Sequence, residues 1–498
     1  MLVDAGGAGR AALAREFDLC VIGAGPAGIT LARRAAGLGL DVALMEAGGE
    51  EMTVDSQEVY EGESLGFDYF PLDTPRLRFL GGSSNHWAGW CRALDPVDFR
   101  AKAWNPMSGW PIAKADLDPY QPATDEILDL IPADWAPDLP SRLNGDDLRR
   151  FQFRWSPPTN FREKYAAELV ASERIVLALN ANLVDLRLDD ALGRVEAAAF
   201  RGYDSSDPGF AIRARAYALC CGGIENPRLL LNFASQQAAG LGNGADLVGR
   251  YFCEHPHFVL AEAILRAPFP ELSFFAPTED FIARNEVLNF GLRVQKMPEP
   301  FVREHGSIAG DPSCDDPFVL RLAERLAEVS PACAPGGDGA IRFDGLLRIA
   351  YEQALNPDSR VMLAEATDRF GMRRPALDFR LSELDERTLE VALMTLAQRM
   401  AALDMGRARI RDWVLAEPIG WPLITQDEVG GKHHMGTTRM ADDPRRGVVD
   451  RDCRVHGVAN LYIGGSSVFA TGGHANPTYT IVQLALRLGD HLGTTLAP

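Results

Sequence analysis

Residues 23–28 read Gly-Ala-Gly-Pro-Ala-Gly, and they decide the fold of this 498-residue chain. An apolar run over residues 17–22 leads into them. An Ala- and Leu-rich segment over residues 29–38 follows, and a second apolar run, residues 42–45, ends at Glu46. This order predicts strand, tight turn, helix and strand, with Glu46 placed to accept hydrogen bonds from a ribose. We therefore predict an α/β fold with a Rossmann-like βαβ unit that binds an adenine dinucleotide.

Each residue of this turn has a predicted role in holding the dinucleotide. Gly23 permits the tight turn, Gly25 lets the backbone approach a pyrophosphate, and Gly28 allows the helix to pack closely on the strand. The helix that begins beside Pro26 and Ala27 offers free N–H groups to the phosphates. The motif alone does not separate NAD from FAD, so the rest of the chain has to decide.

Length, charge and cysteine usage limit the remaining classes. A chain of 498 residues favours two joined domains, and its net charge of -19 disfavours nucleic acid as a partner. The same acidic balance favours amino sugars over sugar acids as substrates. The eight cysteines form no C-x-x-C pair, so no metal site is predicted. Residues 1–15 do not resemble a secretory signal, and no run approaches about 18 apolar residues. We predict a cytoplasmic protein without a membrane span.

The rest of the chain reads as further strands, a long loop region and further helices, one of them at the start of residues 161–222. Residues 51–110 are rich in Gly, Pro and Trp, and such a long irregular stretch is usually functional. Strands are predicted over residues 175–179, 183–188, 213–221 and 461–463, and alternating runs that indicate an antiparallel sheet occupy residues 259–265, 287–294 and 340–349. Helices are predicted over residues 222–231, 383–403 with Ser382 as N-cap, and 480–492.

Six segments together resemble the glucose–methanol–choline (GMC) oxidoreductase family. In chain order they are the βαβ unit with Glu46-Ala47-Gly48-Gly49, residues 80–87, residues 221–230, residues 240–256, residues 356–371, and residues 433–492. Each is modest alone, but the six follow one another over nearly the whole chain. Within the family, the motifs are most similar to pyranose oxidase-like and sugar- or aminoglycoside-oxidising members. The resemblance implies tightly bound FAD.

The resemblance also implies how two domains alternate along the chain, in a fold that is α+β overall. An FAD-binding domain would comprise residues 1–110, 161–255 and 433–498. Residues 111–160 would form an excursion over the active site. Residues 256–432 would form a substrate domain, an antiparallel sheet that roofs the flavin.

His433 and Asn476 are the predicted catalytic residues. His433 has the register of the family's H-x-x-G-T pattern, whereas His434 is out of register by one. Asn476 stands where the family has a second His or Asn. Alcohol oxidation needs a base for the hydroxyl proton, and histidine suits that role because its ordinary pKa is about 6.5. The Asn amide cannot take the proton but can hold the alcohol oxygen. His474 is a further candidate for a substrate contact.

The resemblance also implies the flavin contacts. His86 has the register of a histidine that bonds covalently to the flavin in pyranose oxidase-like members; a covalent bond and a noncovalent contact both stay open. The predicted cofactor-binding set is Gly23, Gly25, Pro26, Ala27, Gly28, Glu46, Ala47, Gly81, Gly82, Ser83, Asn85, His86, Trp87, Ala88, Leu183, Gly222, Gly464, Gly465, Ser466, Pro477 and Thr478.

The implied function is FAD-dependent oxidation of a hydroxyl on a sugar-like substrate, such as a glycoside or aminoglycoside. His433 would act as base and the hydride would reach flavin N5. Two alternatives remain: a GMC-type lyase with a non-redox flavin, and the flavin subunit of a larger electron-transfer dehydrogenase. The residues do not decide whether the electron acceptor is oxygen, a quinone or a redox protein, nor the oligomeric state.

Overall fold

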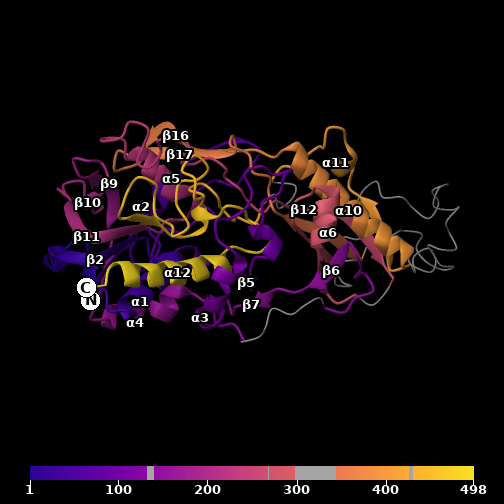
Figure 1. Cartoon of the computed structure of the whole chain (residues 1–498), viewed down its shortest axis with the longest axis horizontal. Helices are drawn as coiled ribbons and strands as arrows, with labels where there is room; N and C mark the ends of the chain where they lie inside the picture. The colour runs from indigo at the N-terminus through magenta and orange to yellow at the C-terminus, as the bar shows by residue number, and fades with distance from the viewer. Residues whose placement is uncertain (132–138, 267–268, 298–343, 425–429, 498) are drawn as a thin grey trace.

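The computed structural model describes residues 1–131, 139–266, 269–297, 344–424 and 430–497. Figure 1 shows an elongated molecule with both chain termini at one end and a second group of strands and helices, around β12 and α10, at the other. The predicted α/β fold is confirmed. Within the described residues, no helix is long and apolar enough to cross a membrane.

An eight-stranded sheet, parallel at its centre, forms the first part of the molecule. Its order is β1 (Leu2–Asp4), β8 (Ile175–Leu179), β3 (Val42–Met45), β2 (Glu16–Ile22), β11 (Phe210–Leu219), β10 (Val195–Arg201) and β9 (Asn182–Leu188), with β19 (Leu461–Ile463) also paired to β11. β3 and β8 are buried throughout, as expected for parallel strands covered on both faces. The long helix α12 (Thr478–Thr495) packs along α1 (Pro26–Gly37), as Figure 1 shows.

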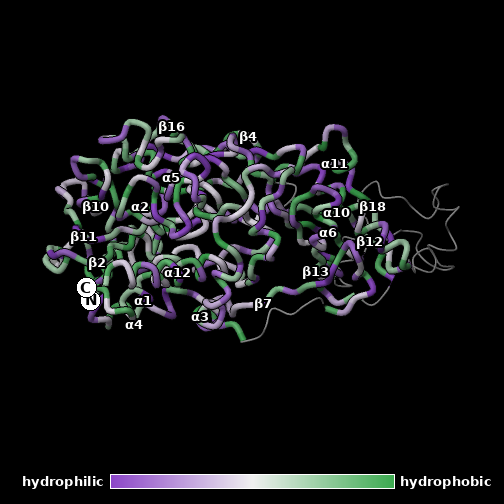
Figure 2. The backbone as a smooth tube through the Cα atoms, viewed as in Figure 1, coloured by the Kyte–Doolittle hydropathy of each residue, from purple (hydrophilic) through white to green (hydrophobic). Residues whose placement is uncertain are grey.

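A six-stranded antiparallel sheet forms the second part. Its order is β18 (Gly406–Ile410), β12 (His257–Leu265), β15 (Gly345–Tyr351), β14 (Phe290–Lys296), β13 (Leu272–Pro277) and β6 (Leu148–Phe151). In β15 buried and half-buried residues alternate, so that Leu347, Ile349 and Tyr351 join a core with Leu389 and Leu393 of α10 (Glu383–Ala402). The intervening residues face the other way. Figure 2 shows hydrophobic stretches both around β2 and around α6 (Glu279–Asn285), in keeping with two separate cores.

Smaller elements connect these two sheets. A three-stranded sheet of β16 (Arg360–Thr367), β17 (Arg373–Phe379) and β4 (Glu63–Gly66) packs on α5 (Gly222–Asn232). The remaining helices and strands are α2 (Val54–Gln57), α3 (Gln121–Ile127), α4 (Phe161–Ala171), α11 (Asp412–Leu415) and the pair β5 (Trp90–Cys91) with β7 (Arg154–Trp155). β6 comes from the predicted excursion, and β16 and β17 pair outside the six-stranded sheet. The exact domain boundaries stay a prediction.

The predicted elements agree with the structure except at some ends. Ser382 is the N-cap of α10, where it forms a capping box with Asp385. The strand predicted to include residues 220 and 221 ends earlier, at Leu219. Cys221 has left the extended conformation because it is the N-cap of α5, so both cysteines lie in the turn and not in the strand. β14 begins at Phe290 rather than at residue 287, and residues 340–343 of another predicted strand lie outside the described residues.

Candidate active site

A cavity of about 570 Å³ lies between the βαβ unit and the six-stranded sheet. This volume is within the range of about 300–1,000 Å³ that is usual for ligand pockets. The wall is built from the turn after β2, the loop over residues 75–90, the turn after β11, one face of the six-stranded sheet, and residues from 430 onward. Segments far apart in the sequence therefore meet here.

Three helices begin at this cavity. The lining includes Pro26 of α1, Gly222 of α5 and Thr478 of α12, each at the first position of its helix or directly beside it. None of these helices has a side-chain hydrogen bond at its N-cap. Free N–H groups and the positive end of the helix dipole attract anions. The arrangement fits a bound group with negative charge at more than one point, as FAD has.

The glycine turn is packed as its predicted role requires. A β-carbon on Gly28 would lie 1.8 Å from the carbonyl oxygen of Gly23, so only glycine lets α1 lie this close to the turn. Gly23 has a φ of +99°, a conformation that side chains rarely adopt. Glu46 accepts hydrogen bonds from the backbone N–H groups of Ala24, at 2.8 Å, and Gly48, at 2.9 Å. The carboxylate thus ties the first turn to the end of β3.

Most of the predicted cofactor set lines the cavity. Gly28, Gly81, Asn85 and Gly464 do not, because each is occupied with packing or hydrogen bonds of its own. Asn85 Nδ2 donates to the Gly82 carbonyl at 2.7 Å, and a β-carbon on Gly464 would lie 2.8 Å from Cys220 Sγ. Gly81 lies against the backbone of residue 162. These four residues stabilise the local turns, whereas the other predicted residues line the cavity.

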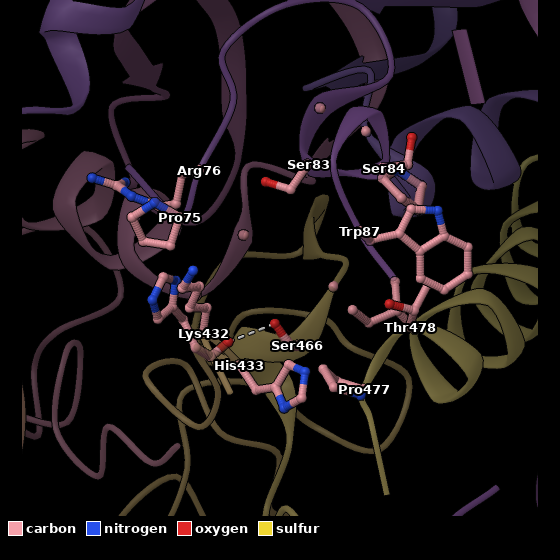
Figure 3. Close-up of a pocket in the computed structure, with 18 of the residues that line it drawn as sticks. Pro75, Arg76, Ser83, Ser84, Trp87, Lys432, His433, Ser466, Pro477 and Thr478 are labelled. Carbon is pink, nitrogen blue, oxygen red and sulfur yellow. Dashed lines mark hydrogen bonds between the residues drawn. The ribbon is translucent and has the colours of Figure 1, made fainter. Parts of the chain in front are cut away.

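His433 and Asn476 line the same cavity, as predicted. Figure 3 shows His433 and Pro477 on one side of it and Ser83 and Ser84 on the opposite side. His433 Nδ1 lies 2.9 Å from Nδ1 of His255, a fully buried residue that the sequence did not single out. The backbone N–H of His433 donates to Glu254 Oε1 at 2.7 Å. The histidine is therefore fixed at both its ring and its backbone.

The two other histidines of interest have different surroundings. His434 Nε2 lies 3.0 Å from the hydroxyl of Tyr69, and burial lowers the pKa of His434 to about 3. This residue is part of an aromatic core and not a base. His474 Nε2 lies 3.3 Å from Asp95 Oδ2, and its ring also lines the cavity. His474 is thus close enough to contact a substrate.

Several lining residues were not predicted because they face the cavity only through the fold. Aromatic rings of Phe151, Phe153, Phe274 and Trp90 form one connected wall, with centroid separations of 5.2–5.7 Å. Basic side chains and a further histidine complete the lining; they are Arg76, Arg78, His257, Arg293, Arg348 and Lys432. The alternation of apolar and polar residues along β14 and β15 was the available signal for these lining residues. It predicts two faces of the sheet but does not indicate which of them binds a ligand.

Comparison with known proteins gives a family match for the C-terminal part of the chain. A family model described as GMC oxidoreductase matches residues 356–485, the segment that contains His433, Asn476 and the start of α12. These residues resemble the C-terminal domain of GMC oxidoreductases. The chain is 24% identical to 2-methyl-1,2-propanediol dehydrogenase of Mycolicibacterium austroafricanum, over 96% of this chain and 95% of that protein. It is also 24% identical to 6'''-hydroxyparomomycin C oxidase of Streptomyces lividus, over 97% and 92% respectively.

A solved structure supports the fold of the chain. Pyridoxine 4-oxidase from Mesorbium loti superposes with a TM-score of 0.55 at 16% identity, covering 95% of this chain and 98% of that one. Taken together, the family match and these relatives identify an FAD-dependent oxidoreductase that acts on CH–OH groups. The cavity with its three uncapped helix N-termini fits that cofactor.

Proposed function

We propose that this enzyme oxidises a hydroxyl of a sugar-like substrate such as a glycoside or aminoglycoside, with His433 as the base. The observation that carries the proposal is a hydrogen-bond chain that runs from the backbone through His255 to His433. Two relatives support the substrate class, since one is named for a diol and the other for a hydroxyparomomycin. When bound, FAD supplies the acceptor for the hydride.

These hydrogen bonds determine which nitrogen of the His433 ring carries the lone pair. A carbonyl can only accept, so the Gly472 oxygen, 3.2 Å from His255 Nε2, requires a proton on that nitrogen. His255 Nδ1 is then the acceptor, and His433 Nδ1, 2.9 Å away, must be the donor. The lone pair of His433 consequently lies on Nε2, the nitrogen outside this chain. A neutral imidazole in that tautomer can take a hydroxyl proton at Nε2.

Both rings are neutral under ordinary conditions. Burial lowers the pKa of His255 to about 4, and the Gly472 backbone opposes this shift only in part. Burial, together with His255 and His257, lowers the pKa of His433 well below its usual range. His433 is therefore available as an acceptor of protons over a broad pH range. Asn476, in the same lining, would hold the alcohol oxygen without competing for the proton.

Replacing His255 with leucine should lower kcat while leaving KM nearly unchanged. Loss of the acceptor lets the His433 ring take either tautomer, and a hydrogen bond between neutral groups is worth roughly 2- to 10-fold. The measurement is the steady-state kcat and KM of the FAD-loaded variant. His255→Asn is the matched control, because its side-chain oxygen can accept the same hydrogen bond and should restore most of kcat. Equal losses in both variants would show that His255 serves only packing.

Anaerobic titration of the purified enzyme with sugars, glycosides and aminoglycosides tests the proposed function. A substrate should abolish the absorbance of the bound flavin, because the hydride has been transferred. A lyase with a non-redox flavin would turn over a compound without this change. Co-purification with a second chain, and reduction only in its presence, would instead indicate the flavin subunit of a larger dehydrogenase.

The mode of flavin attachment at His86 can be decided separately. The imidazole lines the cavity on the same loop as Ser83 and Trp87. Burial lowers the pKa of His86, which favours the neutral ring, although the Pro75 backbone opposes this. After acid precipitation, a covalent bond keeps the flavin with the protein pellet, whereas a noncovalent contact releases it. His86→Ala should abolish retention in the first case only.

A further inference from the structure

Two arginines stand directly opposite one another on the cavity face of the six-stranded sheet. Arg293 of β14 and Arg348 of β15 are register partners, and both line the cavity. Like charges placed opposite each other on neighbouring strands are destabilising. Each arginine also has interaction partners of its own. Two adjacent guanidinium groups at a substrate cavity are nevertheless well placed to share an anion.

The neighbouring row of the sheet contains two small residues and lies close to His474 and His433. Gly291 and Ala350 are register partners there, and both line the cavity. A β-carbon on Gly291 would lie 3.1 Å from His474 Nδ1. His257 continues this row, and its ring centroid lies 6.2 Å from that of His433. Residues two apart on a strand are about 7 Å apart, so the arginine row lies roughly that far from the row over His433.

Lys432 places a third cation beside the base. It precedes His433 in sequence and lines the same cavity (Figure 3), with its Nζ 4.7 Å from the ring centroid of Phe70. Within the described part of the chain, the carboxylates of the lining are Glu46 and Glu225, which belong to the βαβ unit and to α5. Among the described lining residues, the ionisable side chains of the sheet face are therefore basic, although the whole chain carries -19.

The aromatic wall adjoins the arginines. Phe274 of β13 is the register partner of Arg293, and Phe151 of β6 is the partner of Phe274. The Arg293 guanidinium lies 5.8 Å from the ring centroid of Trp90. Apolar rings exclude water, and charge-assisted hydrogen bonds strengthen in such a setting. A carbon skeleton can lie on these rings while its charged end reaches the guanidinium groups.

We propose that the substrate is a hydroxyl compound that also carries a carboxylate or phosphate ester, bound by Arg293 and Arg348 while its CH–OH lies at His433. The inference rests on the proposed function and specifies the charge of its substrate. Guanidinium groups recognise both anions through paired hydrogen bonds. The distance of about 7 Å between the two rows suits a sugar acid or a sugar phosphate. The basic lining of the cavity thus favours an anionic substrate, whereas the acidic net charge of the chain suggested a cationic one.

The test uses matched sets of ligands with the FAD-loaded enzyme. Glucose, gluconate, glucose 6-phosphate and glucosamine are titrated anaerobically to follow the flavin absorbance, and steady-state turnover with an artificial electron acceptor gives KM for each. We expect one or both anionic members to have the lowest KM, and comparing gluconate with glucose 6-phosphate separates carboxylate from phosphate. Arg293→Gln and Arg348→Gln should each raise that KM roughly 10- to 100-fold, as expected for hydrogen bonds between charged groups. KM for glucose should change little.

Arg407→Gln is the matched control. Arg407 lies on β18 of the same sheet, pairs with Asp404 at 3.3 Å and is outside the cavity lining, so its loss should leave every KM unchanged. Lysine at position 293 or 348 keeps the charge but loses the paired geometry and should give an intermediate KM. These variants also serve if a glutamine variant does not fold.

The possible outcomes separate this inference from the proposed function. Preference for glucose or glucosamine over both anions would overturn the inference and leave the function intact. If no member bleaches the flavin, the wider titration with glycosides and aminoglycosides decides the proposed function, and binding decides the inference. In that case gluconate or glucose 6-phosphate should still perturb the flavin band of the wild-type enzyme and lose this effect in both glutamine variants. If neither anion perturbs the flavin band of the wild-type enzyme, the inference of an anionic substrate is overturned.

Discussion

Replacing His433 with glutamine should leave FAD bound and slow the reduction of the flavin by substrate about 10²- to 10⁴-fold, the usual contribution of a general base. Glutamine keeps a polar side chain of similar length, but its amide cannot accept the hydroxyl proton at neutral pH. The measurement is the anaerobic rate of flavin bleaching in a stopped-flow instrument, at saturating substrate. The flavin-to-protein ratio should stay at the wild-type value.

His434→Gln is the control for this variant, because it changes the next residue and the same type of side chain. The His434 ring lies 3.0 Å from the Tyr69 hydroxyl and packs against Phe252, with ring centroids 5.9 Å apart. Its replacement should lower the thermal unfolding temperature and change the rate of flavin reduction little. A full rate in His433→Gln would exclude His433 as the base and direct attention to His474, another imidazole of the lining, whose Nε2 lies 3.3 Å from Asp95 Oδ2.

The sequence was sufficient for the features that local patterns determine. The order of residues 17–46 is enough to predict β2, α1 and β3, since a buried strand, a glycine turn and a helix follow one another without interruption. The helix over residues 383–403 follows from its N-cap and its apolar positions. His433 and Asn476 follow from a family pattern, and the cavity contains both.

Features that depend on distant partners could not be predicted. His255 reaches His433 across 178 residues, and no local pattern links the two. Alternation predicted a strand around Arg293, but only the register with β15 brings Arg348 beside it and shows that both face the cavity. The acidic composition pointed to a cationic substrate because net charge averages over the surface, whereas a substrate meets the few groups of one cavity.

Replacing Gly28 with alanine should remove most of the bound FAD and destabilise the protein by about 3 kcal/mol, at the upper end for an overpacked core position. A β-carbon here would lie 1.8 Å from the Gly23 carbonyl oxygen, which belongs to backbone and cannot rotate away as a side chain would. α1 must therefore move off the turn, and its N-terminal amide groups leave the position that faces the cavity. The measurements are flavin content after purification and the midpoint of denaturant-induced unfolding.

Gly37→Ala is the control, since the same substitution is made in the last residue of the same helix. A β-carbon on Gly37 would meet no other atom within 4 Å. Alanine here restricts the unfolded chain and favours the helix, so Gly37→Ala should stabilise the protein by roughly 0.5–1 kcal/mol and retain all of its FAD. Opposite signs in the two variants would show that contact with the turn, and not helix propensity, fixes α1. Full flavin content and unchanged stability in Gly28→Ala would mean that another contact, such as the packing of α12 on α1, positions the helix end that meets the cofactor.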